Sequence, residues 1–247
     1  MSRFRRMLLL LFSFITACEK SKQGTPPSGE APRSFQLPIV TGEAEGRVFW
    51  RGEGALRPAV VIPSNLRKYC GDRVEPAGAK KDPDGGLAEV VISLKNAPGS
   101  KQLSDQKVRG VIDQQRCRYT PEVIAVQAGG FLEIRNSDPI LHNVRAETPG
   151  HSLFNVAMPL QGLSVRKPLP QTEAAVELHC DLHPWMSATV KVFPHPYFAV
   201  SGPGGHFYLQ GFPVGRQTLI LWHRQLGTVE REIIVSRPPG SRQDLYF

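Results

Sequence analysis

Residues 174–186 read AAVELHCDLHPWM, and this stretch joins a strand pattern to a cluster of side chains that bind metals. Every second residue from Ala174 to Cys180 is apolar or bears a thiol, which is the period of a β-strand with one buried face. Cys180 is therefore expected to point into the protein core at the end of the strand. His183 and Met186 follow in the turn and at the start of the next strand, close enough to surround one atom.

A further histidine, His142, lies upstream in the stretch NSDPILHN of residues 136–143. One thiolate, two imidazoles and one thioether are what a mononuclear blue-copper site needs, because soft sulfur suits Cu(I) and imidazole suits both oxidation states. We therefore expect Cys180, His183 and Met186 to supply three ligands from one loop, with His142 added from a distant strand. The alternative is a domain that keeps the fold and binds zinc or nothing.

The chain from Gly46 onward consists of short apolar runs with period-two alternation, separated by clusters of Gly, Pro, Asn and Asp. This pattern is typical of an antiparallel β-sandwich or barrel. No stretch keeps an apolar i, i+3, i+4, i+7 pattern long enough for a helix, so we expect an all-β fold. The expected strands are 47–50, 59–62, 87–95, 108–113, 122–127, 131–136, 174–180, 188–193, 197–201, 206–210, 217–223 and 229–235.

The Cys-x-x-His-x-x-Met spacing and the upstream His-Asn pair resemble the cupredoxin family, with a ligand loop most similar to those of amicyanin and pseudoazurin. The resemblance covers roughly residues 45–193 and implies a Greek-key β-sandwich with one copper ion that cycles between Cu(I) and Cu(II). It implies three equatorial ligands and a long axial one: His142, Cys180 and His183, with Met186 as the axial ligand.

The same resemblance implies a supporting role for Asn143, which would bond across to the ligand loop near Cys180 and Asp181 and fix the site. Cupredoxins often carry Ser or Thr where this chain has Asp181. A carboxylate at this position departs from the family pattern and could lower the reduction potential.

Copper in such a site carries one electron. The protein holds a coordination geometry between those preferred by the two oxidation states, so little rearranges on transfer. We expect the ring edge of His183 near the surface as the port for the electron. Pro184 and Trp185 beside it would form an apolar docking patch for a fast, weak encounter with a redox partner protein. Trp185 could equally be a core aromatic that seals the site from water.

His179 precedes Cys180, and a His-Cys dipeptide is also how copper nitrite reductases link an electron-transfer copper to a catalytic copper. Those enzymes need further histidines, and residues 143–150 contain none. The simpler interpretation places His179 on the solvent side opposite Glu177. A binuclear copper site is excluded, since it would need two cysteines in the loop. No Ser-His-Asp order, Gly-rich phosphate loop or paired-carboxylate motif is present.

Two prolines in the stretch FPHP of residues 193–196 mark a break between strands. The segment 195–247 resembles the second half of the carboxypeptidase regulatory-like, transthyretin-like β-sandwich, a module with no chemistry of its own. Because this segment is short for a complete sandwich, residues 46–62 could pair with it. We expect a cupredoxin-like domain over 45–194 and a regulatory-like β segment over 195–247.

Cys70 and Cys117 lie in the part of the chain before His142. In an oxidising compartment they are expected to form a disulfide, which would stabilise the fold by roughly 4 kcal/mol on the chain-entropy estimate. The alternative is a pair of buried thiols.

The N-terminus has a short basic region followed by an apolar run that ends at Ala17. This run is too short to span a bilayer as a helix, so residues 1–17 are predicted to be a secretory signal. The sequence ITAC at its end resembles the lipobox of bacterial lipoproteins, which implies lipidation of Cys18. By the same resemblance, a Gram-negative host would send the protein to the outer membrane. An ordinary signal peptide is the alternative.

Residues 18–44 are rich in Pro and Gly and are expected to form a flexible tether.

The formal charge of +8 falls to +5 when Arg3, Arg5 and Arg6 leave with the signal. No basic stripe with interleaved aromatics is present, so nucleic acid is excluded as a partner. We therefore predict a monomeric, lipid-anchored one-electron carrier of the bacterial envelope rather than an enzyme. The alternatives are a copper-binding or delivery protein with the same ligands, an adhesion or scaffold module, and a nitrite reductase-like enzyme.

Overall fold

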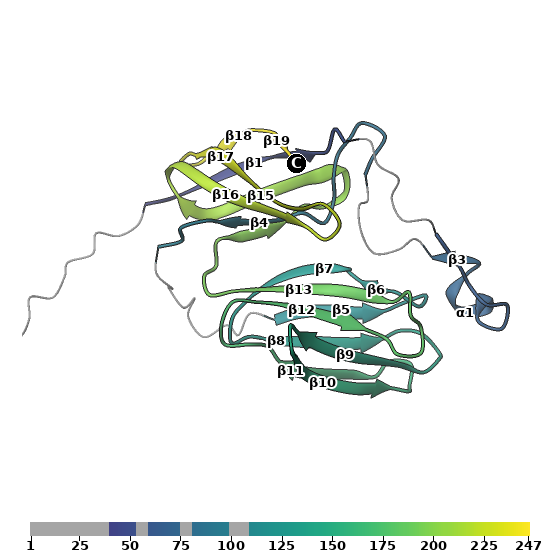
Figure 1. The fold of residues 1–247 in the computed structure, drawn as a ribbon. Coiled ribbons are helices and arrows are strands. Elements are labelled where there is room, and N and C mark those ends of the chain that lie inside the picture. The colour runs from purple at the N-terminus through teal and green to yellow at the C-terminus, as the bar shows by residue number, and fades with distance from the viewer. Residues whose placement is uncertain (1–39, 53–58, 75–80, 99–108) are drawn as a thin grey trace, which may run out of the picture. The chain divides into compact units, whose positions relative to one another are not determined.

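The computed structural model is built almost entirely from β-strands (Figure 1). Among the residues that it describes, the helices are the single turn α1 (Arg67–Cys70) and the 3-10 turn η1 (Pro203–Gly205). The all-β prediction is therefore confirmed. No helix in these parts of the chain has the length and apolar character needed to cross a membrane. The described residues are 40–52, 59–74, 81–98 and 109–247.

Two sheets pack into one sandwich, of which one sheet carries the predicted copper ligands, and we call them together the site sandwich. One sheet has the strand order β10-β9-β12-β13-β7, and the other has the order β11-β8-β5-β6 (Figure 1). Both sheets contribute side chains to one buried apolar core, for example Ile112, Ile134 and Val176. The strands are β5 (Arg109–Gln114), β6 (Tyr119–Thr120), β7 (Val123–Gln127), β8 (Phe131–Asn136), β9 (His142–Thr148), β10 (His151–Met158), β11 (Ser164–Pro168), β12 (Ala174–His179) and β13 (Ser187–Phe193).

The site sandwich contains two parallel strand pairs, which the expectation of an antiparallel sandwich did not include. β13 runs parallel to β7, and β5 runs parallel to β8, whereas the other pairs are antiparallel. Alternation in a sequence shows which face of a strand is buried, but it does not show the direction of the neighbouring strand. The two-sheet Greek-key class was therefore predictable, and the strand directions were not.

A second pair of sheets combines strands from both ends of the described chain, and we call it the second sandwich. β1 (Thr41–Phe49) pairs with β15 (His206–Pro213) in register from Thr41 opposite Pro213 to Arg47 opposite His206. The other sheet has the order β14-β4-β16-β17 (Figure 1). The remaining strands of this sandwich are β4 (Val91–Leu94), β14 (Phe198–Val200), β16 (Gly215–His223), β17 (Gly227–Val235), β18 (Ser241–Arg242) and β19 (Leu245–Tyr246).

This pairing bears on the expected boundaries. The range 45–194 includes β1 and β4, which pair with C-terminal strands because their apolar faces join one core with Leu209 and Leu219. The expected tether 18–44 is too long at its end, since β1 begins at Thr41 and Ala44 is buried. The rest of the tether, the signal peptide and Cys18 lie outside the described residues. A short hairpin of β2 (Val60–Val61) and β3 (Arg73–Val74) flanks α1.

Four strands of the site sandwich, β6, β9, β10 and β11, were not expected from the sequence. β10 and β11 form sheet edges, and their burial patterns leave most residues exposed or half-buried. An edge strand of this kind has no continuous apolar face to reveal it. β9 has a buried first half, and its polar residues there, His142 and Asn143, belong to the candidate site.

Candidate metal centre

The strand register brings the two halves of the predicted site together. β12 and β9 are antiparallel, with His179 opposite Arg145, so the residues that follow β12 lie beside the start of β9. His142 is the first residue of β9, and Cys180 directly follows β12. A ligand pair separated by 38 positions in the chain therefore meets at one end of one sheet.

The loop between β12 and β13 closes on itself through backbone hydrogen bonds. The N–H of Cys180 donates to the carbonyl of Met186 at 3.2 Å, and the N–H of Met186 donates to the carbonyl of His183 at 2.8 Å. Cys180, His183 and Met186 are all buried, and His142 is completely buried. The loop thus turns its three potential ligands inward and away from water.

Three donor atoms converge in this buried space. The Nδ1 atoms of His142 and His183 are 2.9 Å apart, and Sγ of Cys180 lies 4.0 Å and 3.6 Å from them, respectively. A point in the plane of these atoms lies roughly 2 Å from each, in the range of metal bonds to imidazole and thiolate of about 2.0–2.3 Å. The three donors present therefore fit a copper ion, and Met186 supplies a buried thioether from the same loop.

The electrostatics of this cluster favour the thiolate form of Cys180. Burial alone would raise the pKa of the thiol, but hydrogen bonds from His142, His183 and backbone N–H groups outweigh it and lower the pKa to about 6. A thiolate is the form that binds a metal. Burial would lower the pKa of His142, whereas its contacts with Asp138 and Cys180 raise it above the usual value.

Asn143 joins β9 to the ligand loop by a reciprocal pair of hydrogen bonds. Its Nδ2 donates to Oδ2 of Asp181 at 2.7 Å, and the backbone N–H of Asp181 donates to its Oδ1 at 2.7 Å. Nε of Arg145 also donates to Asp181 at 2.9 Å. The bonds of Arg145 and Asn143 hold the pKa of the Asp181 carboxyl below its usual value. The acidic residue in the loop thus forms a bridge with Asn143 and remains charged.

The side of the loop around His183 is more enclosed than expected. His183 is only 4% exposed, so the expectation of a surface ring edge is wrong, because Trp185 lies against it with a ring-centroid distance of 5.4 Å. Trp185 is half-buried, packs against the core and donates from Nε1 to the carbonyl of Cys117 at 3.2 Å. Pro184 and Leu182 are exposed beside it. Trp185 therefore covers the ring of His183, and part of its own side chain remains accessible to solvent.

His179 lies on the other face of β12. Its Nε2 is 3.7 Å from a carboxylate oxygen of Glu147 on β9, and about a third of its side chain is exposed. It therefore lies beside Glu147 rather than near the buried donors. His179 belongs to none of the potential metal-binding groups found among the described residues.

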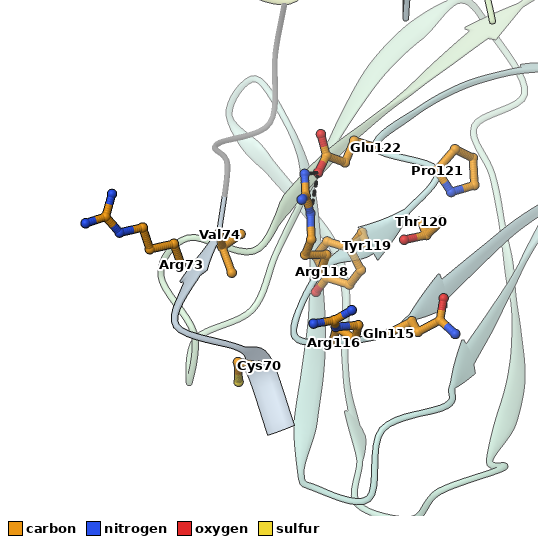
Figure 2. Close-up of a pocket in the computed structure, with 10 residues that line it drawn as sticks. All are labelled: Cys70, Arg73, Val74, Gln115, Arg116, Arg118, Tyr119, Thr120, Pro121 and Glu122. Atoms are coloured by element: carbon orange, nitrogen blue, oxygen red, sulfur yellow. Dashed lines mark hydrogen bonds and ion pairs between the residues drawn. The ribbon is translucent and has the colours of Figure 1, made fainter. Parts of the chain in front are cut away.

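Cys70 and Cys117 are joined by a disulfide, and Cys180 is a free buried cysteine. The disulfide ties α1 to the turn between β5 and β6. Beside it lies a cavity of about 420 Å³ whose lining includes Arg116, Arg118 and Glu122 (Figure 2). Arg118 pairs with Glu122 there, and none of the predicted copper ligands lines this cavity.

Sequence analysis did not single out Asp138, Tyr119 or Gln114, although all three support the site. Asp138 contacts His142, while Tyr119 and Gln114 donate side-chain hydrogen bonds to the carbonyl of Asn143 at 2.8 Å and 3.3 Å. The one available signal was the position of Asp138 four residues before His142. Tyr119 and Gln114 belong to the opposite sheet, so only the packed fold reveals their contact.

The chain was compared with family profiles, curated proteins and solved structures. No family profile and no curated protein matches the chain. A purple cupredoxin from Nitrosopumilus maritimus is similar at 22% identity over 34% of this chain and 98% of that one, with a TM-score of 0.29. Amicyanin from Paracoccus versutus is similar at 18% identity over 41% of this chain and 96% of that one, with a TM-score of 0.31.

A Cu-containing nitrite reductase from Thermus scotoductus is similar at 18% identity over 40% of this chain, with a TM-score of 0.30. The match covers only 25% of that enzyme.

Proposed function

We propose that this chain is a copper-binding one-electron carrier of the cupredoxin type. The observation that carries the proposal is the buried convergence of two imidazole nitrogens and one thiolate sulfur at 2.9–4.0 Å from one another. This donor set suits copper in both oxidation states. The proposed ligands of the mononuclear type 1 site are His142, Cys180, His183 and Met186.

Each residue has a defined task in this proposal. Copper, when bound, supplies the one-electron Cu(I)/Cu(II) couple. Cys180 offers a thiolate near neutral pH, because the pKa of its thiol is lowered to about 6. The Asn143–Asp181 bridge and the backbone bonds of the loop hold the donors in place in either oxidation state. Burial keeps water from competing as a ligand.

The exposed residues of the ligand loop are the proposed contact with a redox partner protein. Pro184 is exposed, Leu182 is 50% exposed, and Trp185 connects this apolar surface to His183. A small apolar contact suits an encounter that must form and dissociate quickly. Electrons would then enter or leave through Trp185 and the covered ring of His183.

We further propose that the protein works in the bacterial cell envelope, attached to a membrane by lipid on Cys18 after removal of residues 1–17. The disulfide between Cys70 and Cys117 supports an oxidising compartment. The second sandwich, with its regulatory-like C-terminal segment, is proposed to hold no chemistry of its own. A carrier of this kind is expected to act as a monomer.

The test is to add Cu(II) to the purified full chain and to record visible and paramagnetic-resonance spectra. We expect an intense thiolate-to-copper band at one copper per chain, which Cys180→Ser removes. Met186→Leu should change the spectrum. Met158→Leu is the matched control, because Met158 is also completely buried and lies opposite His142 in the β9–β10 register.

The other outcomes are equally definite. A colourless protein would refute the copper proposal. Slow electron exchange combined with copper transfer to an apo-protein would assign the chain to copper delivery. A trimer with two coppers per chain would point to a nitrite reductase-like enzyme, in which His179 would gain a partner histidine. A chain that keeps its cellular role in the Cys180→Ser form would be an adhesion or scaffold module.

A further inference from the structure

The buried carboxylate of Asp138 contacts one ring nitrogen of the proposed ligand His142, and Cys180 lies near the other. Nε2 of His142 donates to Oδ2 of Asp138 at 2.9 Å, and both side chains are almost completely buried. The two nitrogens of one imidazole ring are thus divided between two tasks. Nε2 contacts Asp138, and Nδ1 faces His183 and Cys180.

Asp138 is itself held by the turn between β5 and β6. The backbone N–H groups of Arg116 and Cys117 donate to its Oδ1 and Oδ2 at 2.6 Å and 2.8 Å. Its own backbone N–H donates to the side chain of Asn136 at 3.0 Å. A carboxylate with three hydrogen bonds to its oxygens is fixed in position and remains ionised. These bonds outweigh the effect of burial and lower its pKa.

The conformation of this turn explains why two consecutive N–H groups point at one carboxylate. Arg116 and Cys117 have φ angles of 53° and 56°, and Gln115 and Arg118 are bonded to each other across them. Two successive residues with positive φ form a tight hairpin turn, and successive N–H groups in such turns make a concave receptor for anions. The disulfide from Cys70 anchors this turn at Cys117.

Cys117 also reaches the second histidine of the centre. Its carbonyl accepts the hydrogen bond from Trp185, whose ring lies against His183. One turn therefore supports His142 through Asp138 and His183 through Trp185.

We propose that Asp138, clamped by the Arg116–Cys117 turn, is the positioning residue that directs Nδ1 of His142 toward the metal and strengthens it as a ligand for Cu(II). This inference rests on the proposed copper function. A carboxylate bonded to the outer nitrogen of a metal-bound histidine fixes the ring and makes its other nitrogen a better donor. The negative charge favours the more highly charged Cu(II) over Cu(I).

The test compares Asp138→Asn and Asp138→Ala with the unmodified full chain. Loss of such a partner typically weakens metal binding by about 10–100-fold. We expect this loss for Cu(II) and a smaller loss for Cu(I), so the reduction potential should rise by about 59 mV for each tenfold difference. Asp138→Glu, which restores the charge, should recover part of the change.

Glu133→Gln is the matched control, because Glu133 is a buried carboxylate of β8 that pairs with Arg135 and contacts neither histidine. This control should leave the potential and both copper affinities unchanged. Circular dichroism would verify that each variant is folded. Unchanged affinities and potential in folded Asp138→Asn and Asp138→Ala would refute the positioning role, as would an equal change in Glu133→Gln.

A second measurement uses the metal-free, unmodified chain, so it depends neither on copper binding nor on the folding of a variant. Nitrogen-15 NMR of the metal-free, unmodified chain should show a proton on Nε2 of His142 that exchanges slowly with water. A His142 ring with its only proton on Nδ1 would overturn the proposal. This result is independent of the copper spectrum, so a protein that binds no copper but shows the Nε2 proton would refute the proposed function and leave the Asp138 contact established.

Discussion

The two sandwiches bury histidine in opposite ways. In the site sandwich, both ring nitrogens of His142 have partners, and contacts with Asp138 and Cys180 raise its pKa. In the second sandwich, His223 is just as buried, but its Nε2 has no hydrogen-bond partner among the described residues, and burial lowers its pKa to about 4. The same side chain is thus prepared for binding in one core and kept neutral in the other.

The difference extends to the rest of the two cores. The core of the site sandwich contains a free thiol, a thioether and a set of hydrogen-bonded polar side chains at one end. The core of the second sandwich is built mainly from aliphatic and aromatic side chains such as Leu209, Phe212 and Leu221, and its buried polar residues Ser93, Ser201 and His223 are not gathered around a thiol. Burying a polar group costs free energy unless it is paired. The paired polar cluster therefore indicates where this protein has kept chemistry instead of packing alone.

The largest expected effect is a loss of stability in the site sandwich alone. Replacing Cys70 and Cys117 together by alanine should destabilise the site sandwich by about 4 kcal/mol, because the disulfide closes a long loop. Denaturant unfolding should be followed by a copper signal and by tryptophan fluorescence, since two cores can unfold separately. The copper signal should be lost at a lower denaturant concentration than in the unmodified chain.

The control is the second sandwich, which contains no disulfide among the described residues. Peptide-resolved hydrogen exchange at β16 and β17 should show little change in the double variant. An equal loss of protection in both sandwiches would mean that they unfold as one unit. A copper signal with unchanged stability would show that the disulfide does not support the site.

The comparison also shows what the sequence could reveal. The strand and loop over 174–186 were predictable, because strict alternation fixed the inward face of β12 and the spacing of ligands fixed the loop. The contact of His142 with Cys180 followed only from the assumption that both belong to one site. The shortness of segment 195–247 already suggested that residues 46–62 could pair with it, but the partner strand β15 and the register needed the fold, since they join residues more than 150 positions apart.

Other contacts have almost no signature in the sequence. Asp138 reads as an ordinary turn residue before a proline, and its role depends on a turn more than 20 positions upstream. The positive φ angles of Arg116 and Cys117 are also unexpected, because glycine or asparagine usually occupies such turns. The disulfide at Cys117 and the hydrogen bonds to the carboxylate of Asp138 explain how the chain holds this conformation without glycine or asparagine.

The next effect in size tests whether the site depends on packing in its own sandwich. Leu178 on β12 and Leu219 on β16 are both completely buried, one in each core. Leu178→Ala and Leu219→Ala should each cost about 3 kcal/mol of unfolding free energy, within the range of about 2–5 kcal/mol for such cavities. Chemical denaturation measures this cost for each variant.

Of the two substitutions, only Leu178→Ala should affect the metal site. Leu178 lies two residues before Cys180 on the same face of β12, so a cavity there should broaden or shift the thiolate-to-copper band. Leu219→Ala should leave the band unchanged at equal destabilisation. A change of the same size in both variants would mean that the spectrum follows overall stability rather than local packing.

The smallest expected effect concerns His223 of the second sandwich, whose Nε2 has no hydrogen-bond partner among the described residues. His223 titrates near pH 6.5 when unfolded and at about 4 when folded, so the unfolded chain binds the proton first as the pH falls. Its contribution to stability is therefore complete above pH 6.5 and decreases as the pH falls toward 4, by at most about 3 kcal/mol. Urea unfolding of the metal-free chain between pH 7 and pH 4 should show a smaller loss of unfolding free energy in His223→Leu than in the unmodified chain.

The matched control is His206→Gln, a change to an exposed histidine of the same sandwich, which should keep the original pH dependence. An unaltered slope in His223→Leu would mean that His223 gains a partner in solution, and the contrast with His142 would then disappear.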